Sequence, residues 1–256
     1  MTYFVCGIII KIQYKKVFFI NSLKIFENIE FNDTDGNKNM PKVEGRELPY
    51  YNELERKINY ITHLFGALIS VVFTVLLLIK VIPTKDTLKI VSSAIYGLSV
   101  INMFTMSTIY HFVRNEETRR KMQKCDHISI SISIAGSSTP LLLCGIGTTA
   151  AIAMVCVSWG LTAVCFVCNA ISPKKFMILT ILCYIAMGWM LMIFIKDIFI
   201  SLTPLGTYLL LAGGISYTAG IIPFAMVKHN YGHAVWHFFV LIGSFFVMAC
   251  VYFFAV

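Results

Sequence analysis

The sequence predicts an all-α membrane protein, built as a bundle of seven transmembrane helices with the N-terminus in the cytosol and the C-terminus outside. Hydrophobic residues make up 57% of the 256 residues, and the mean hydropathy is +0.76. Charged residues make up only 13%, about half of the ~25% usual in soluble domains. A soluble protein of this length would leave too much apolar surface in water, so we expect an integral, multi-pass protein surrounded by lipid.

The chain divides into an N-terminal region, residues 1–50, and a seven-span domain, residues 51–256. In the first region the longest apolar run, Tyr3–Ile10, is shorter than the ~20 residues needed to cross a bilayer. It predicts an amphipathic surface helix or a targeting segment, although the order of charge and apolar core is not that of a signal peptide. Residues 27–49 are polar, which is typical of a disordered stretch.

Seven apolar segments follow, each close to the length that crosses a bilayer. They are roughly residues 58–80, 89–112, 127–146, 149–171, 176–195, 205–227 and 234–256. Only a short Gly–Thr stretch separates the third from the fourth. Pro140 and Pro223 fall inside segments and are expected to kink them. In the sixth segment Gly213, Gly214 and Gly220 offer small surfaces suited to close helix packing.

The basic residues give the orientation. With the N-terminus in the cytosol, twelve Lys and Arg residues lie in or near the cytosolic loops and four lie on the opposite side. Lys and Arg gather on the cytosolic side of membrane proteins, so the count favours this orientation. The net charge of +8 suits an anionic leaflet. No basic stripe interleaved with aromatic residues is present, so we expect no nucleic-acid partner.

The eight cysteines do not form a disulfide pattern. Six of them lie in apolar runs, where they are predicted to pack as small hydrophobic residues: Cys144, Cys156, Cys165, Cys168, Cys183 and Cys250. The spacing of Cys165 and Cys168 matches a redox motif, but the pair lies in the middle of a span and has no second pair. We therefore predict neither a redox site nor a metal site there.

Polar residues at the ends of three segments are the candidates for a functional site. With the predicted orientation, the end of the second segment and the starts of the third and seventh lie on the cytosolic side. His111, Asp126, His233 and His237 are then at similar depth. Charged or metal-binding side chains at the edge of a bilayer are costly, so they indicate a functional site.

Three histidines of this group have the pattern of metal ligands. His233 and His237 are four residues apart, so a helix places both imidazoles on one face. His111 adds a third nitrogen from another helix. Three protein nitrogens leave one tetrahedral position open, as in catalytic zinc sites that bind a water molecule. Zn²⁺ is therefore the expected cofactor, although spacing alone does not exclude other metals.

Two further residues suit catalysis at such a centre. Asp126 is expected to hold or deprotonate the metal-bound water as a general base. Ser107 lies one helical turn before His111 and is placed to bond a water molecule or the substrate carbonyl. His127 follows Asp126 directly, so a helix points it away from its neighbour, and it is left out of the predicted site.

Simpler interpretations of these residues stay open. Two histidines near a membrane interface often only extend toward the headgroups. His229 continues the spacing by one turn, but the following Asn-Tyr-Gly interrupts the helix, so we expect a loop residue. Glu55, Asn59 and His63 are spaced four apart at the start of the first segment. They line the entrance of the site or form a polar packing seam between helices.

Four segments resemble the hemolysin III family, which belongs to the progestin and adipoQ receptor superfamily and is related to alkaline ceramidases. They are ERKINYITHLFGALIS, STIYHF, CDHISISISIAGSSTP and HAVWHFFVLIGS, in that order. The resemblance covers about residues 50–256. It implies that His111, His233 and His237 bind zinc, that Asp126 lies near the zinc-bound water and that Ser107 belongs to the second-span motif. The polar residues of the first segment match the family motif there.

The resemblance implies three functions, which stay open. One is zinc-dependent hydrolysis of an amide or ester bond in a membrane lipid, with a ceramidase-like activity as one form. A second is lysis of membranes by a pore, which would require homo-oligomers. In the ISISIS run serine alternates with isoleucine, and a period of two does not line one face of a helix. These serines therefore do not indicate the lining of a pore. The third is a receptor-like protein with structural zinc, which the very short outer loops make less favourable. In each case the partner is a membrane or its lipids.

Overall fold

The structure, a computed structural model, describes residues 51–225 and 231–256. Every regular element in this part of the chain is helical, and seven helical stretches in it are long and apolar enough to cross a membrane. The prediction of an all-α, seven-span membrane protein is confirmed. A cytosolic N-terminus stays a prediction from the charge count. The expected surface helix and disordered stretch before residue 51, and His229, lie outside the described residues.

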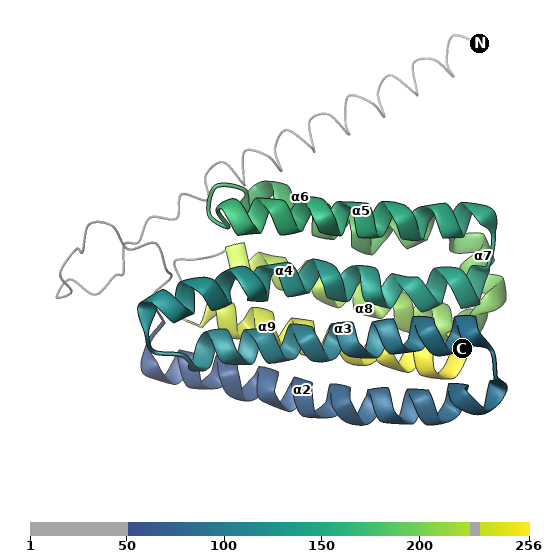
Figure 1. Ribbon diagram of the computed structural model, residues 1–256, viewed down its shortest axis with the longest axis horizontal. Coiled ribbons are helices and arrows are strands. Elements are labelled where there is room, and N and C mark those ends of the chain that lie inside the picture. Colours follow the sequence, from purple (N-terminus) through teal and green to yellow (C-terminus); the bar gives the residue numbers. More distant parts are fainter. Residues whose placement is uncertain (1–50, 226–230) are drawn as a thin grey trace, which may run out of the picture. The chain divides into compact units, whose positions relative to one another are not determined.

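The α-helices are α2 (Glu53–Val81), α3 (Thr87–Phe112), α4 (Glu116–Pro140), α5 (Thr149–Ile171), α6 (Met177–Trp189), α7 (Ile195–Ser201), α8 (Thr203–Ala225) and α9 (Gly232–Cys250). Short 3₁₀ helices cover Ile82–Thr84 and Met190–Phe194, and π-helical turns cover Leu141–Ile146 and Val251–Ala255. The helices run side by side in one bundle (Figure 1). In it α2 packs against α3 and α9, α3 against α4, and α8 against α9.

Two spans begin earlier than their apolar residues indicate. The predicted start of the first span at residue 58 is wrong, because α2 begins at Glu53, where the Asn52 side chain accepts a hydrogen bond from the Glu55 backbone N–H at 2.8 Å. The predicted start of the third span at residue 127 is also wrong. The side chain of Asn115 caps α4, which continues through polar turns before it becomes apolar. Polar caps fix these boundaries, since they satisfy the free backbone N–H groups of the first turn.

The third and fifth spans change helix type along their length. Pro140 ends the regular part of α4, and Leu141–Ile146 continue the span as a π-helix. Proline has no backbone N–H and crowds the preceding turn, so a disturbance at this position is expected. Gly147, with φ of 69°, and Thr148, which caps α5, complete the short join to the fourth span. In the fifth span, Met190–Phe194 form a 3₁₀ helix between α6 and α7.

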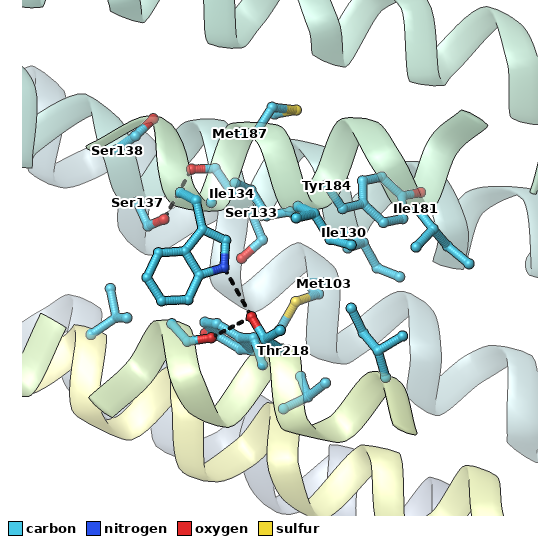
Figure 2. Close-up of a pocket in the computed structure, with 18 of the residues that line it drawn as sticks. Met103, Ile130, Ser133, Ile134, Ser137, Ser138, Ile181, Tyr184, Met187 and Thr218 are labelled. Atoms are coloured by element: carbon cyan, nitrogen blue, oxygen red, sulfur yellow. Dashed lines mark hydrogen bonds between the residues drawn. The ribbon is translucent and has the colours of Figure 1, made fainter. Parts of the chain in front are cut away.

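The bundle encloses a cavity of about 180 Å³. Apolar side chains of α3, α4, α6, α8 and α9 form most of its wall, among them Met103, Ile130, Ile134, Ile181 and Met187 (Figure 2). Gly188 of α6 and Thr218 of α8 also line it and are exposed. The Trp189 indole N–H donates a hydrogen bond to Thr218 Oγ1 at 3.0 Å, so it bridges these two helices.

The cysteines differ in their surroundings. All seven in the described part of the chain are free thiols. Four of the six expected to pack as small hydrophobic residues are buried, namely Cys165, Cys168, Cys183 and Cys250. Cys144 is half-buried, and Cys156 is exposed, so Cys156 does not pack inside the bundle.

The glycines of α8 differ in how closely the next helix approaches. A Cβ atom on Gly213 would lie 2.7 Å from Val247 Cγ2 and 3.2 Å from the Gly243 carbonyl oxygen. A Cβ atom on Gly220 would lie 2.7 Å from Phe239 Cβ. At these two positions the predicted close packing is present, and the neighbour is α9. On Gly214 the nearest contact would be Trp189 at 3.8 Å, which is an ordinary distance, so the prediction is wrong there.

We expect Gly213→Ala to lower the melting temperature in detergent and Gly214→Ala to leave it unchanged or raise it. Both changes gain up to about 1 kcal/mol of helix propensity. Only Gly213→Ala forces α8 and α9 apart, and overpacking of this kind costs about 1–3 kcal/mol. The adjacent glycine serves as the control, and equal effects at both positions would contradict the packing argument. Circular dichroism during heating measures the difference.

Candidate metal centre

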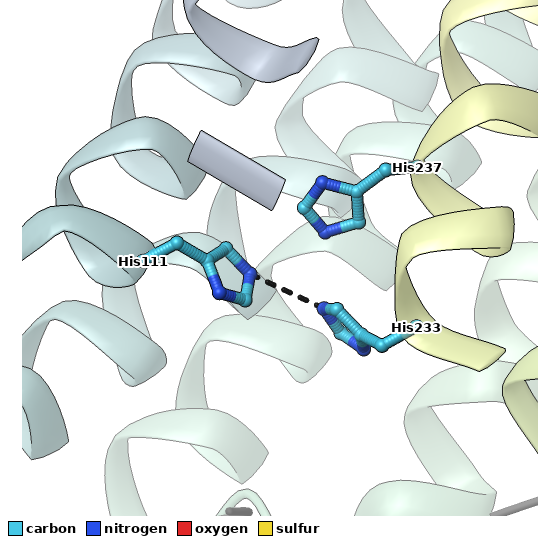
Figure 3. A group of neighbouring side chains, drawn as sticks. All are labelled: His111, His233 and His237. Atoms are coloured by element: carbon cyan, nitrogen blue, oxygen red, sulfur yellow. Dashed lines mark hydrogen bonds between the residues drawn. The ribbon is translucent and has the colours of Figure 1, made fainter. Parts of the chain in front are cut away.

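Three histidines from two distant spans meet at one end of the bundle. The ring nitrogens of His111, His233 and His237 offer ligand atoms that all lie within 4.8 Å of one another (Figure 3). The Nε2 atoms of His111 and His233 are 3.2 Å apart, although the two residues are separated by 122 positions in the chain. The structure thus brings together the three residues that were predicted as ligands. That prediction used the spacing of the two histidines in the seventh segment and the side of the membrane at which each segment starts or ends.

The helices fix where these imidazoles point. His111 lies in the last turn of α3 and is fully buried, with the Tyr110 ring 4.5 Å from its own ring centre. His233 and His237 lie one turn apart on α9, with ring centres 4.7 Å apart. Because α9 packs against α2 and starts at the end where α3 stops, its first two turns face the last turn of α3.

The donor set fits a zinc ion. Ligands bound at ~2.05 Å in a tetrahedral zinc site lie about 3.3 Å apart, close to the separation between His111 Nε2 and His233 Nε2. The Nδ1 atoms of His111 and His237 are buried and have no hydrogen-bond partner among the described residues. Buried polar atoms almost always have a partner. Three imidazoles and no protein carboxylate among them suit zinc better than magnesium or calcium.

Asp126 and Ser107 lie next to this centre. Both are buried, with 7% and 2% of their surface exposed, and their side chains share a hydrogen bond. Both line the cavity, as do His233 and His237. The carboxyl group therefore faces the same space as two of the three imidazoles. His127, which the sequence pattern had pointed away from Asp126, also contributes to the wall of this cavity.

The polar stripe of the first span reaches the same place. The ring of His63 stacks on that of His237 with centres 3.7 Å apart and an angle of 25° between the planes. His63 lines the cavity as well. Both ring nitrogens of His63 and both amide atoms of Asn59 are buried without a hydrogen-bond partner in the described structure. Glu55 is buried one turn before Asn59. His63 is therefore a neighbour of the three-histidine group as well as a helix-packing residue.

The sequence profile of haemolysin-III related proteins matches residues 51–248. The chain belongs to the haemolysin-III related family. It is similar to the "Hemolysin-3 homolog" of Bacillus subtilis (strain 168), with 34% identity over 202 residues that cover 79% of this chain and 95% of that protein. It is similar to "Hemolysin-3" of Bacillus cereus, with 33% identity over 200 residues that cover 78% of this chain and 91% of that protein. The expected hemolysin III resemblance is confirmed.

This haemolysin-III related protein also has residues at the centre that the sequence analysis missed. The Tyr51 ring lies 5.3 Å from that of His111 and 5.0 Å from that of His233. Tyr51 precedes the first span, and burial raises its pKa well above the usual 10, so its phenol is neutral at physiological pH. Arg119 lies over Tyr51 and Tyr110, with its guanidinium carbon 5.5 and 5.4 Å from the two ring centres. Neither residue belongs to a histidine or carboxylate spacing, so no sequence pattern pointed to them.

We expect the purified haemolysin-III related protein to hold one zinc ion per chain, and His111→Ala or His237→Ala to release it. Loss of a ligand should weaken binding by more than the ~10–100-fold seen when a residue behind a ligand is changed. His127→Ala is the matched control, because His127 lies outside the three-histidine group, and it should keep the metal. Elemental analysis after dialysis measures this. Full zinc content in the His237→Ala protein would exclude the site.

Proposed function

We propose that the protein hydrolyses an amide or ester bond of a membrane lipid, using zinc held by His111, His233 and His237. The observation that carries this proposal is the position of the site. Two of the three histidines and a buried carboxyl group lie at one end of a cavity inside the bundle, and apolar side chains form most of the remaining wall. A polar centre joined to an apolar cavity suits a substrate with a reactive carbonyl and a hydrocarbon chain.

The cavity supports a lipid as substrate. Its volume of about 180 Å³ exceeds that of an engineered apolar cavity of ~150 Å³ that stays dry and binds benzene. Gly188 of α6 and Thr218 of α8, which are both exposed, line it, so we infer an entrance between these two helices. A lipid chain entering there would pass directly from the bilayer into the protein. The hydrocarbon would then be transferred between two apolar surroundings, without the cost of crossing water.

The residues of the chain divide the chemistry between them. Zinc, when bound, polarises a carbonyl and lowers the pKa of a bound water. Asp126, which lines the same cavity as His233 and His237, would take the proton from the attacking water and return it to the leaving amine or alcohol. Ser107 orients that carboxyl group through their shared hydrogen bond. The C–N or C–O bond breaks, and water adds to give a fatty acid and the free amine or alcohol. The apolar wall keeps other water from the site.

Two other functions have support of their own. The names of the two Bacillus relatives favour membrane lysis, either by an oligomeric pore or as a result of lipid damage. A purely structural role for zinc is favoured by the way the three histidines join α3 to α9. A metal in that role would hold two spans together, as in the receptor-like alternative.

We expect purified protein to release fatty acid from ceramide or from a lysolipid, and His237→Ala to abolish the release. Asp126→Asn should lower kcat by about 10²–10⁴-fold, which is the range for loss of a general base, while zinc stays bound. Asp197→Asn is the control, because Asp197 is exposed on α7 and should keep full activity. Chromatographic measurement of the released acid tests this. Equal release by wild type and His237→Ala would remove the metal from the reaction.

Erythrocyte lysis separates the alternatives. If lysis follows from hydrolysis, it should continue in the presence of osmotic protectants of every size and should stop in the Asp126→Asn protein. Protection by solutes above one size, with lysis unchanged in Asp126→Asn, would indicate a pore instead. A structural metal would show itself differently. Chelation would then lower the melting temperature of a protein that turns over no lipid.

A further inference from the structure

A cluster of side chains covers the metal centre on the side away from the cavity. Tyr51 stands directly before Asn52, the residue that caps α2. Its ring is in contact distance of the rings of His111 and His233. None of Tyr51, Tyr110 and Arg119 lines the cavity. The histidines therefore lie between two layers, with the cavity on one side and the aromatic cluster on the other.

The cluster lies at the charged end of the bundle. Glu53, two residues after Tyr51, pairs with Arg114 at 2.9 Å, and Lys121 pairs with Glu117 at 2.8 Å. These side chains are exposed, so this end of the bundle faces water. Among the described residues, the cluster lies between this end and the imidazoles of His111 and His233.

Arg119 holds the two tyrosine rings of this cluster in place. Its guanidinium carbon lies 5.5 Å from the centre of the Tyr51 ring and 5.4 Å from that of Tyr110. A guanidinium within about 6 Å of an aromatic face is attracted by the electrons of the ring. Tyr110 is itself 1% exposed and lies against His111. The chain before α2, the end of α3 and the start of α4 thus meet over the histidines.

We propose that Tyr51 is a positioning residue of the metal centre, which closes it toward water and holds the imidazoles of His111 and His233 in place, with Arg119 fixing its ring. The proposal rests on the metal site of the proposed function but not on lipid hydrolysis. It implies that the metal and the reacting groups exchange with the bilayer side through the cavity, and only slowly with the aqueous phase.

The test is the rate at which zinc-loaded, full-length protein in detergent gives up zinc to a water-soluble chelator. Tyr51→Ala should raise this rate by about 10–100-fold, the range found when a residue that supports a metal ligand is removed. Tyr51→Phe keeps the ring and should lose zinc near the wild-type rate. Arg119→Gln should raise the rate by a smaller factor. Tyr60→Ala is the matched control, because Tyr60 lies near the same end of α2 but packs on Phe112.

A second measurement needs no metal. The protein is treated with diethyl pyrocarbonate, which modifies accessible imidazoles, and modified positions are mapped by mass spectrometry. Modification of His111 and His233 should increase in Tyr51→Ala and in Arg119→Gln but not in Tyr60→Ala. Unchanged zinc release and unchanged modification in Tyr51→Ala would overturn the proposal. If the wild-type protein hydrolyses no lipid, the proposed hydrolase function is refuted. If the histidines nevertheless become accessible in Tyr51→Ala, the proposed role of Tyr51 is supported.

Discussion

The packing of three imidazoles against each other, two of them buried, at one end of an apolar bundle is the constraint on which the rest of the structure depends. A polar group inside a membrane costs several kcal/mol unless it has a partner. His111 and His237 are almost completely buried, so their partners must come from the protein or from a metal ion that it holds. That need accounts for the meeting of the last turn of α3 and the first two turns of α9.

The same constraint explains why the wall of the cavity differs between its two ends. Near the histidines the wall carries Ser107, Asp126 and His63, whereas farther along it consists largely of Met, Ile and Leu. Polar groups gather in one small volume, and the remaining interior is free to be mostly apolar. A single cavity therefore combines a polar end with a largely apolar remainder. This division, more than any one residue, is what supports a lipid as substrate.

The sequence predicted most of the fold and the three clustered histidines, for identifiable reasons. Hydropathy locates spans, because lipid forces about twenty consecutive residues to be apolar. Because the chain changes side with every span, the end of the second span and the start of the seventh lie at the same end of the bundle. This placed His111 beside His233 and His237. Helix ends were misplaced, because the caps Asn52 and Asn115 lie outside the apolar runs.

Contacts between elements could not be predicted from one helix at a time. Gly213 and Gly214 look alike in sequence, yet only the first faces α9 closely. Tyr51 carries no motif, and its place over the histidines depends on how the chain enters α2. Such positions follow from the tertiary arrangement, which periodicity alone does not specify.

The separation of His111 from His233 by 122 residues has a consequence for biosynthesis. Ribosomes add about 5–20 residues per second, so roughly 6–24 seconds pass between synthesis of His111 and synthesis of His233. During that interval the earlier spans are already entering the bilayer. The seventh span carries both other histidines, so insertion of that helix completes the three-histidine group. Assembly of this group therefore waits for synthesis of the seventh span.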